Sequence, residues 1–124
     1  MPSKRRRSKR LVIFVPEGRR AVSTLPVELS DPWVSRLLDL LARLFGGATA
    51  YGRGVGAWRE GTSEDSIVHY DRITVIESWI DPREPEWEDK SKKVCESLAR
   101  MCRDLEEQAI AWMVDGIFDL VRSR

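Results

Sequence analysis

The chain has 124 residues, a length that fits one domain with a modest core. Hydrophobic residues make up 42% and charged residues 33% of it, a balance typical of a globular protein and not of a disordered or membrane chain. The apolar runs are also too short to cross a bilayer. We therefore expect a single cytoplasmic domain over residues 11–124, with no membrane partner.

The formal net charge of +1 is unevenly distributed along the chain. The first ten residues contain no acid and six basic side chains, namely Lys4, Arg5, Arg6, Arg7, Lys9 and Arg10. We predict a disordered basic arm over residues 1–10 that contacts nucleic acid or another polyanion. The pattern is equally explained by a segment that only improves solubility or lies against the acidic body of the protein.

The first half of the domain shows a strand followed by a helix. Residues 11–15 form an unbroken apolar run, which predicts a central strand buried on both faces. Residues 19–30 have no clear period and are predicted to be a loop. A helix then begins at Pro32, directly after a capping residue, and ends at about Phe45, because Gly46 supplies a left-handed backbone.

A hairpin and a second helix are expected next. Pieces of a second strand, broken or bulged by glycines, lie between Ala48 and Trp58. A third strand over residues 67–80 is rich in Ile, Val, Thr, Tyr and Trp and is long enough to pair with it. A second helix is predicted over residues 86–107, with acidic residues in its first turn, where the helix dipole favours them.

The last segment, residues 109–121, has two possible structures. It could continue the second helix, or it could form a hairpin. Asp115 and Gly116 between two apolar runs are typical of a type I′ turn, so the hairpin is preferred. The order strand, helix, strand, strand, helix, strand then predicts an α+β ferredoxin-like sandwich (βαββαβ), with two helices on one face of an antiparallel sheet.

A short pattern after the first helix suggests a family resemblance. Its residues are Phe45, Gly46, Gly47, Ala48 and Thr49, then Gly52, Gly54 and Trp58. Together with the strands on either side, this pattern resembles that of small uncharacterised prokaryotic proteins. The resemblance implies a ferredoxin-like fold and no particular activity. The order of elements is also similar to that of the trimeric nitrogen-regulatory signalling proteins, as an analogy of fold alone.

Five of the eight glycines fall between residues 46 and 56, and this segment is the predicted ligand-binding or anion-binding site. Glycine backbone lets N–H groups converge on an anion, and an arginine side chain adds a fork of donors. The residues assigned to the site are Gly46, Gly47, Thr49, Gly52, Arg53, Gly54 and Trp58. A bulged or closely packed strand is the alternative explanation of these glycines.

Other ionisable residues give weaker signals. His69 and Asp71 share a strand face, where the carboxylate could orient the imidazole as a general base, although a solvated face explains the pair as well. The acids between Asp71 and Asp89 could hold magnesium, but charge runs beside turns are commonly hydrated surface. We therefore predict no catalytic residue, no metal site and no cofactor.

The sheet is predicted to be apolar on both faces, which favours a homo-oligomer. We expect a non-enzymatic oligomeric interaction or regulatory module, with the glycine-rich hairpin as its ligand or partner site. One alternative is a nucleic-acid-binding protein that uses the basic arm and the sheet aromatics Trp58 and Trp79. Another is a metal-dependent hydrolase, which requires Asp71 and Glu77 to converge in a pocket.

Overall fold

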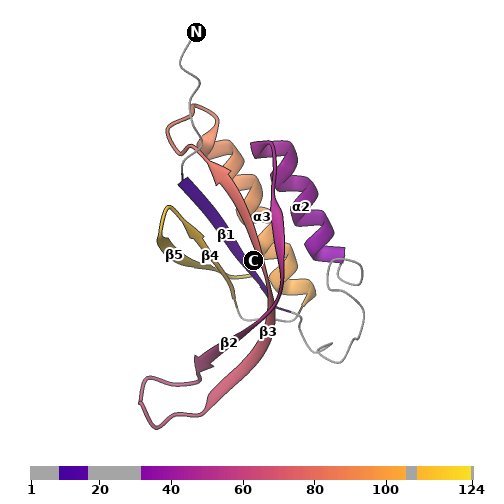
Figure 1. Cartoon of the computed structure of the whole chain (residues 1–124). Helices are drawn as coiled ribbons and strands as arrows, with labels where there is room; N and C mark the ends of the chain where they lie inside the picture. Colours follow the sequence, from indigo (N-terminus) through magenta and orange to yellow (C-terminus); the bar gives the residue numbers. More distant parts are fainter. Residues whose placement is uncertain (1–8, 17–31, 106–108, 124) are drawn as a thin grey trace.

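The computed structural model describes residues 9–16, 32–105 and 109–123. These residues form a five-stranded antiparallel sheet, in the order β2-β3-β1-β4-β5, with both helices on one face (Figure 1). The elements are β1 (Lys9–Pro16), α2 (Pro32–Phe45), β2 (Thr49–Arg59), β3 (Val68–Ile80), α3 (Trp87–Asp104), β4 (Ile110–Val114) and β5 (Ile117–Val121). No described helix lies on the opposite face, which we call the open face.

The central strand is the predicted one. β1 pairs with β3 on one side and with β4 on the other, and Leu11, Ile13 and Val15 are fully buried. The strand begins at Lys9, two residues before the predicted start, so Lys9 and Arg10 belong to the sheet. Alternation of side chains puts Leu11, Ile13 and Val15 on the helix side and Arg10 on the open face.

Both predicted helices are present. α2 begins at Pro32 and buries side chains at a helical spacing, from Trp33 to Phe45. Gly46 ends it with φ 95°, and its N–H donates to the Ala42 carbonyl at 2.8 Å. The capping residues before Pro32, and the loop predicted for residues 19–30, lie outside the described part of the chain. No helix within that part is long and apolar enough to cross a membrane.

The core lies between the sheet and the two helices. Its central members are Leu11, Ile13, Val34, Leu37, Leu41, Ile76, Ile80, Val94, Leu98, Met101 and Ile110. They come from the helix-facing positions of the strands and from the apolar stripes of α2 and α3. α3 itself begins at Trp87, one residue after the predicted start, and ends at Asp104, whereas residues 106–108 lie outside the description.

The C-terminal hairpin is confirmed. β4 and β5 pair over five residues each, joined by Asp115 at φ 52° and Gly116 at φ 79°. Two successive positive φ angles are what a type I′ turn requires, and they are the reason that an aspartate and a glycine stand there. The Asp115 N–H also donates to the Arg10 carbonyl at 2.9 Å, which ties the turn to β1.

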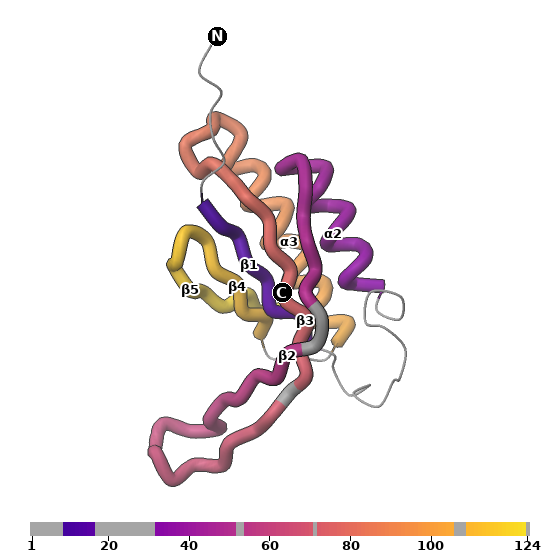
Figure 2. The backbone as a smooth tube through the Cα atoms, in the orientation of Figure 1, coloured from indigo at the N-terminus to yellow at the C-terminus, as the bar shows by residue number. Residues whose placement is uncertain are grey.

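β2 and β3 form a long hairpin that leaves the body of the protein (Figure 2). β2 is one continuous strand, and its register shifts between Tyr51 and Arg53, as expected of a bulge. At 13 residues, β3 spans about 43 Å, whereas the 14 residues of α2 span about 21 Å. The helices therefore cannot cover the distal half of this hairpin, residues 54–73, which we call the arm.

The predicted ferredoxin-like sandwich is wrong as a description of this fold. β5 adds a fifth strand at the edge of the sheet, because the chain turns at Asp115 and Gly116 and returns alongside β4. The β2–β3 arm also projects past both helices (Figure 1). The difference arises from the length of β2 and β3 and from the turn at Asp115 and Gly116. The order of helices and strands along the chain contains neither piece of information.

Candidate functional site

Glu77 is a charged residue held within the sheet. It lies on β3, between Val12 of β1 and Thr49 of β2, and the residue is only 8% exposed. Arg10 on β1 forms an ion pair with its carboxylate, and the Tyr51 hydroxyl on β2 donates to Glu77 Oε1 at 3.1 Å. Three adjacent strands thus bring a cation, a phenol and a carboxylate together on the open face.

The register of the strands explains this cluster. Arg10 pairs across the sheet with Trp79, and Tyr51 pairs with Val75, so each lies diagonally opposite Glu77. The Arg10 guanidinium also lies over the Trp79 ring, 6.0 Å from its centroid. Long side chains from β1 and β2, the two strands that flank β3, therefore cover the carboxylate from both sides.

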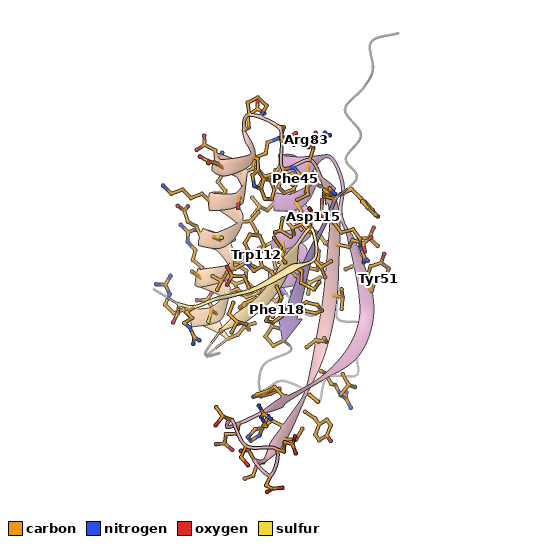
Figure 3. The ribbon with its side chains drawn as sticks, turned by 90° about the vertical axis from the view of Figure 1, so that its left-hand side faces the viewer. Phe45, Tyr51, Arg83, Trp112, Asp115 and Phe118 are labelled. Atoms are coloured by element: carbon orange, nitrogen blue, oxygen red, sulfur yellow. The ribbon has the colours of Figure 1, made fainter. Side chains whose placement is uncertain are left out.

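The Tyr51 phenol remains a hydrogen-bond donor at neutral pH. Its hydrogen bond to Glu77, together with the negative charge of that carboxylate, raises the pKa of Tyr51 above the ordinary value of 10.0. The residue is 48% exposed and points away from the helices (Figure 3). A ligand that reaches Glu77 from the open face therefore meets a protonated tyrosine beside the carboxylate.

A pocket of about 370 Å³ lies beside Glu77. This volume is within the range found for small-molecule sites. Seven residues line the pocket: Phe45, Gly47, Ala48, Thr49, Glu77, Ser78 and Trp79. It is formed where α2 ends and β2 begins, against the last residues of β3. Its wall combines two aromatic rings with the buried carboxylate.

A hydrogen bond fixes the turn at the mouth of this pocket. The Ser78 hydroxyl donates to the Gly47 carbonyl at 2.7 Å, and Ser78 is 1% exposed. A Cβ at Gly47 would meet no atom within 4 Å, so the glycine leaves open space there. Phe45 is supported from behind by Trp87, with ring centroids 6.0 Å apart. The pocket wall is thus held by packing and by one buried hydrogen bond.

The glycine-rich segment predicted as a single site is divided in the structure. Gly47 and Thr49 line the pocket, and Gly46 ends α2 directly before it. Gly54 and Trp58 lie instead on the arm, beyond the register shift. Gly52 lies within that shift, between Tyr51 and Arg53, and the donor role predicted for the Arg53 side chain falls outside the described side chains. Only the first part of the predicted site therefore joins the pocket.

The basic residues are also divided. Arg10 pairs with Glu77, and Lys9 Nζ lies 3.5 Å from Asp115 Oδ1. These two residues contact acidic groups of the protein itself. Lys4, Arg5, Arg6 and Arg7 lie outside the described residues, so their contact with nucleic acid or another polyanion stays a prediction.

The metal-dependent hydrolase is not supported by the arrangement of acids. Asp71 and Glu77 are six residues apart on β3, about 20 Å along the strand, and cannot converge in one pocket. Within the described ranges, no three His, Cys, Asp or Glu side chains come close enough to hold a metal.

His69 lies on the arm, with Nε2 3.0 Å from Glu60 Oε2 and its ring stacked on Trp58 at 5.5 Å.

The partners of Glu77 do not follow from the residue patterns. These patterns predict no role for Tyr51 or for the pocket residue Ser78, and they place Arg10 in the basic arm. One signal was available: Glu77 is the only charged residue between Ile73 and Ile80, in a strand otherwise suited to burial. A charge at such a position needs a partner within the sheet.

The comparisons with known proteins give a fold. No protein-family profile and no curated protein matches the sequence. Two solved structures of a phage SAM lyase match, each with a TM-score of 0.59. One, in complex with S-methyl-5′-thioadenosine, is 17% identical, and the match covers 97% of this chain and 92% of that one. The other, in the apo state, is 15% identical, and the match covers 100% of this chain and 97% of that one.

These matches correct two expectations. The fold is similar to that of the phage SAM lyase over nearly the whole chain, which replaces the ferredoxin-like sandwich. The non-enzymatic interaction or regulatory module is contradicted as well, because the similar structures are those of a lyase, which is an enzyme. The nucleic-acid-binding alternative is not tested by these matches.

Proposed function

We propose that this protein is an enzyme that cleaves S-adenosylmethionine (SAM) and releases S-methyl-5′-thioadenosine. The observation that carries the proposal is Glu77, a buried carboxylate that lines a pocket in a fold similar to that of a SAM lyase. The fold alone would not define a function, since one fold serves many reactions. The proposal therefore depends on the chemistry of the pocket.

The pocket suits the three parts of SAM. Trp79, which is 48% exposed, provides aromatic surface on which the adenine ring can stack. The sulfonium is a cation, and it is attracted both to the Glu77 carboxylate and to aromatic rings. Arg10 is half exposed beside the carboxylate, and its guanidinium can take the carboxylate of the amino-acid part of SAM.

The reaction that fits these residues breaks the bond between the sulfonium and the Cγ of the amino-acid chain. The bonding electron pair goes to sulfur, which becomes the neutral thioether of S-methyl-5′-thioadenosine. The carboxylate of the same chain attacks Cγ and closes a five-membered aminolactone. Every atom of SAM is then present in the two products, and no water, proton or oxidant is consumed.

The hydrogen-bonding state of Glu77 supports this route over elimination. Arg10 donates to Oε2 and Tyr51 donates to Oε1, so both carboxylate oxygens already have donors. With both oxygens holding donors, the carboxylate has no role as a proton acceptor in this route, and its charge orients the sulfonium. Glu77 is therefore assigned an electrostatic and positioning role, and proton removal is not required.

A cytoplasmic location, as predicted from the sequence, would give the enzyme access to SAM.

The test is product analysis with the full chain and SAM. We expect equal amounts of S-methyl-5′-thioadenosine and the aminolactone by mass spectrometry. In deuterated water, no carbon-bound deuterium should enter the lactone during the reaction. Lack of turnover, or formation of S-adenosylhomocysteine by methyl transfer, would overturn the proposal.

A further inference from the structure

Thr49 is a pocket residue to which the proposed reaction gives no role. It pairs directly with Glu77 across β2 and β3, so the two side chains lie on the same face of the sheet. The Cβ atoms of residues paired in this way are about 4.5–5.5 Å apart. Thr49 also lines the pocket and is exposed there. Its hydroxyl can therefore contact a ligand that lies against Glu77.

The Thr49 hydroxyl differs from the other oxygen-bearing side chains of the pocket in having no partner. Three such side chains line the pocket: Thr49, Glu77 and Ser78. Ser78 donates to the Gly47 carbonyl, and both oxygens of Glu77 already have donors. In the part of the chain that the structure describes, no hydrogen bond joins the Thr49 hydroxyl to another group. It can therefore both donate to a ligand and accept from one.

The positions of Trp79 and Arg10 set the direction in which SAM crosses the sheet. In the strand order, β3 lies between β2 and β1. The pocket residues come from the end of α2, the start of β2 and the end of β3, and none of the described residues of β1 is among them. Adenine stacked on Trp79 inside the pocket therefore lies toward β2, whereas an amino-acid carboxylate bound to Arg10 lies toward β1. SAM in this orientation passes over Glu77 with its nucleoside on the Thr49 side.

The ribose of SAM lies between the two groups that Trp79 and Glu77 contact. It joins adenine to the sulfonium and carries hydroxyls at C2′ and C3′. Trp79 and Glu77 are two residues apart on β3, which is about 7 Å along the strand. The ribose spans this distance, and Thr49 is the polar side chain beside it on the β2 side. A sugar hydroxyl that exchanges water for the pocket needs such a partner.

We infer that Thr49 is a specificity-determining residue whose hydroxyl forms a hydrogen bond with a ribose hydroxyl of the substrate. The inference rests on the proposed function, since it takes SAM as the ligand. The ribose hydroxyls take no part in breaking the bond to sulfur, so this contact is the same in the substrate, the transition state and the thioether product. Thr49 therefore favours nucleosides with an intact ribose and contributes to binding, not to the rate of the bond-breaking step.

The test compares two probes by isothermal titration calorimetry with the full chain: S-methyl-5′-thioadenosine and its 2′,3′-dideoxy analogue. Wild type is expected to bind the first more tightly than the second. Thr49→Val keeps the branched shape and removes the hydroxyl, so it should weaken binding of S-methyl-5′-thioadenosine about fivefold to tenfold and leave the analogue unaffected. The KM for SAM should rise by a similar factor, with kcat nearly constant.

Thr49→Ser is the matched control, because it keeps the hydroxyl and loses only a methyl group. It should keep the preference for the intact ribose. A Thr49→Val variant that distinguishes the two probes as well as wild type does would overturn the inference, and so would an equal loss of affinity for both. In either case wild type still binds S-methyl-5′-thioadenosine and cleaves SAM, so the proposed function stands. A wild type that does not bind S-methyl-5′-thioadenosine would overturn the proposed function and this inference together.

Discussion

Two clusters on the same sheet contain similar chemical groups in different surroundings. In the body, Glu77 contacts Arg10 and Tyr51 and lines a pocket. On the arm, Glu60 contacts His69, which stacks on Trp58. Each cluster has an acid, a basic partner and an aromatic ring. The Glu77 side chain is 10% exposed, however, whereas that of Glu60 is 62% exposed.

The difference shows that composition alone does not define a site. Water and salt screen the charge of an exposed carboxylate, so it attracts a cation weakly. A carboxylate held within a sheet interacts through a medium of lower dielectric constant, and its field acts on whatever enters the neighbouring pocket. The Glu77 carboxylate therefore attracts a cation in its pocket more strongly than the Glu60 carboxylate does at the surface of the arm.

The largest expected effect comes from removing the charge of each carboxylate. Glu77→Gln should lower SAM cleavage by about 100-fold, because the amide keeps the shape but loses the field at the sulfonium. Glu60→Gln is the matched control on the arm and should change the rate by less than about twofold. The release of S-methyl-5′-thioadenosine measures both. Equal losses in the two variants would remove the distinction between the clusters.

A smaller effect is expected from Tyr51→Phe, which removes one hydrogen bond to Glu77. This hydrogen bond contributes about 1 kcal/mol to holding the Glu77 carboxylate in position. Its loss should lower the rate of SAM cleavage roughly fivefold to tenfold at neutral pH. Stopped assays of initial rate check this change. An unchanged rate would mean that the phenol does not orient the carboxylate.

The same tyrosine predicts a dependence on high pH. Its pKa is raised in the folded protein by Glu77, so the stabilisation is fully present below the unfolded value of 10.0 and is lost as the pH rises through the folded value. Wild type should lose stability in that range through ionisation of this group, and Tyr51→Phe should lack this component. Ultraviolet absorbance of the phenolate follows the ionisation of Tyr51, and thermal melting follows the stability of the fold. Together they show whether stability is lost over the pH range in which Tyr51 ionises.

Ser78→Ala tests the wall of the pocket. The variant removes the donor to the Gly47 carbonyl in a residue that is 1% exposed, and we expect a loss of about 1 kcal/mol of stability. Urea denaturation measures it. A wild-type midpoint would show that the turn at Gly47 does not need this hydrogen bond.

The smallest effect is expected on the arm. His69→Gln changes an exposed hydrogen bond with Glu60, and stability should change by less than about 0.5 kcal/mol. A large loss of stability in the same urea assay would mean that the arm cluster is structural. The contrast between His69 and Ser78 is thus a direct comparison of exposed and buried polar contacts.

Much of the local structure follows from the sequence by simple rules. Pro32 begins the first helix because its fixed φ is already helical and its missing N–H is not needed there. Gly46 ends that helix, and Asp115 and Gly116 form the C-terminal turn, because these three positions need a positive φ that few residues adopt. The architecture did not follow in the same way. The position of β5 in the sheet and the reach of the arm past the helices did not follow from local rules. Both depend on strand lengths and on which edge of the sheet each strand joins.

The site was predicted only in part. The glycine-rich segment was identified, and Gly47 and Thr49 do line the pocket. The cluster itself joins Arg10 to Glu77, which lies 67 residues later in the chain, through pairing registers that local patterns do not determine. The register shift after Tyr51 adds to this difficulty, since it decides which residues of β2 face β3 beyond that point.

The most direct test of the account is a crystal structure of the protein with S-methyl-5′-thioadenosine. The account predicts density for this ligand in the pocket, with the adenine ring against Trp79 and the sulfur facing the Glu77 carboxylate. Density on the arm beside Trp58, with the pocket empty, would contradict the account and make the exposed cluster the binding site.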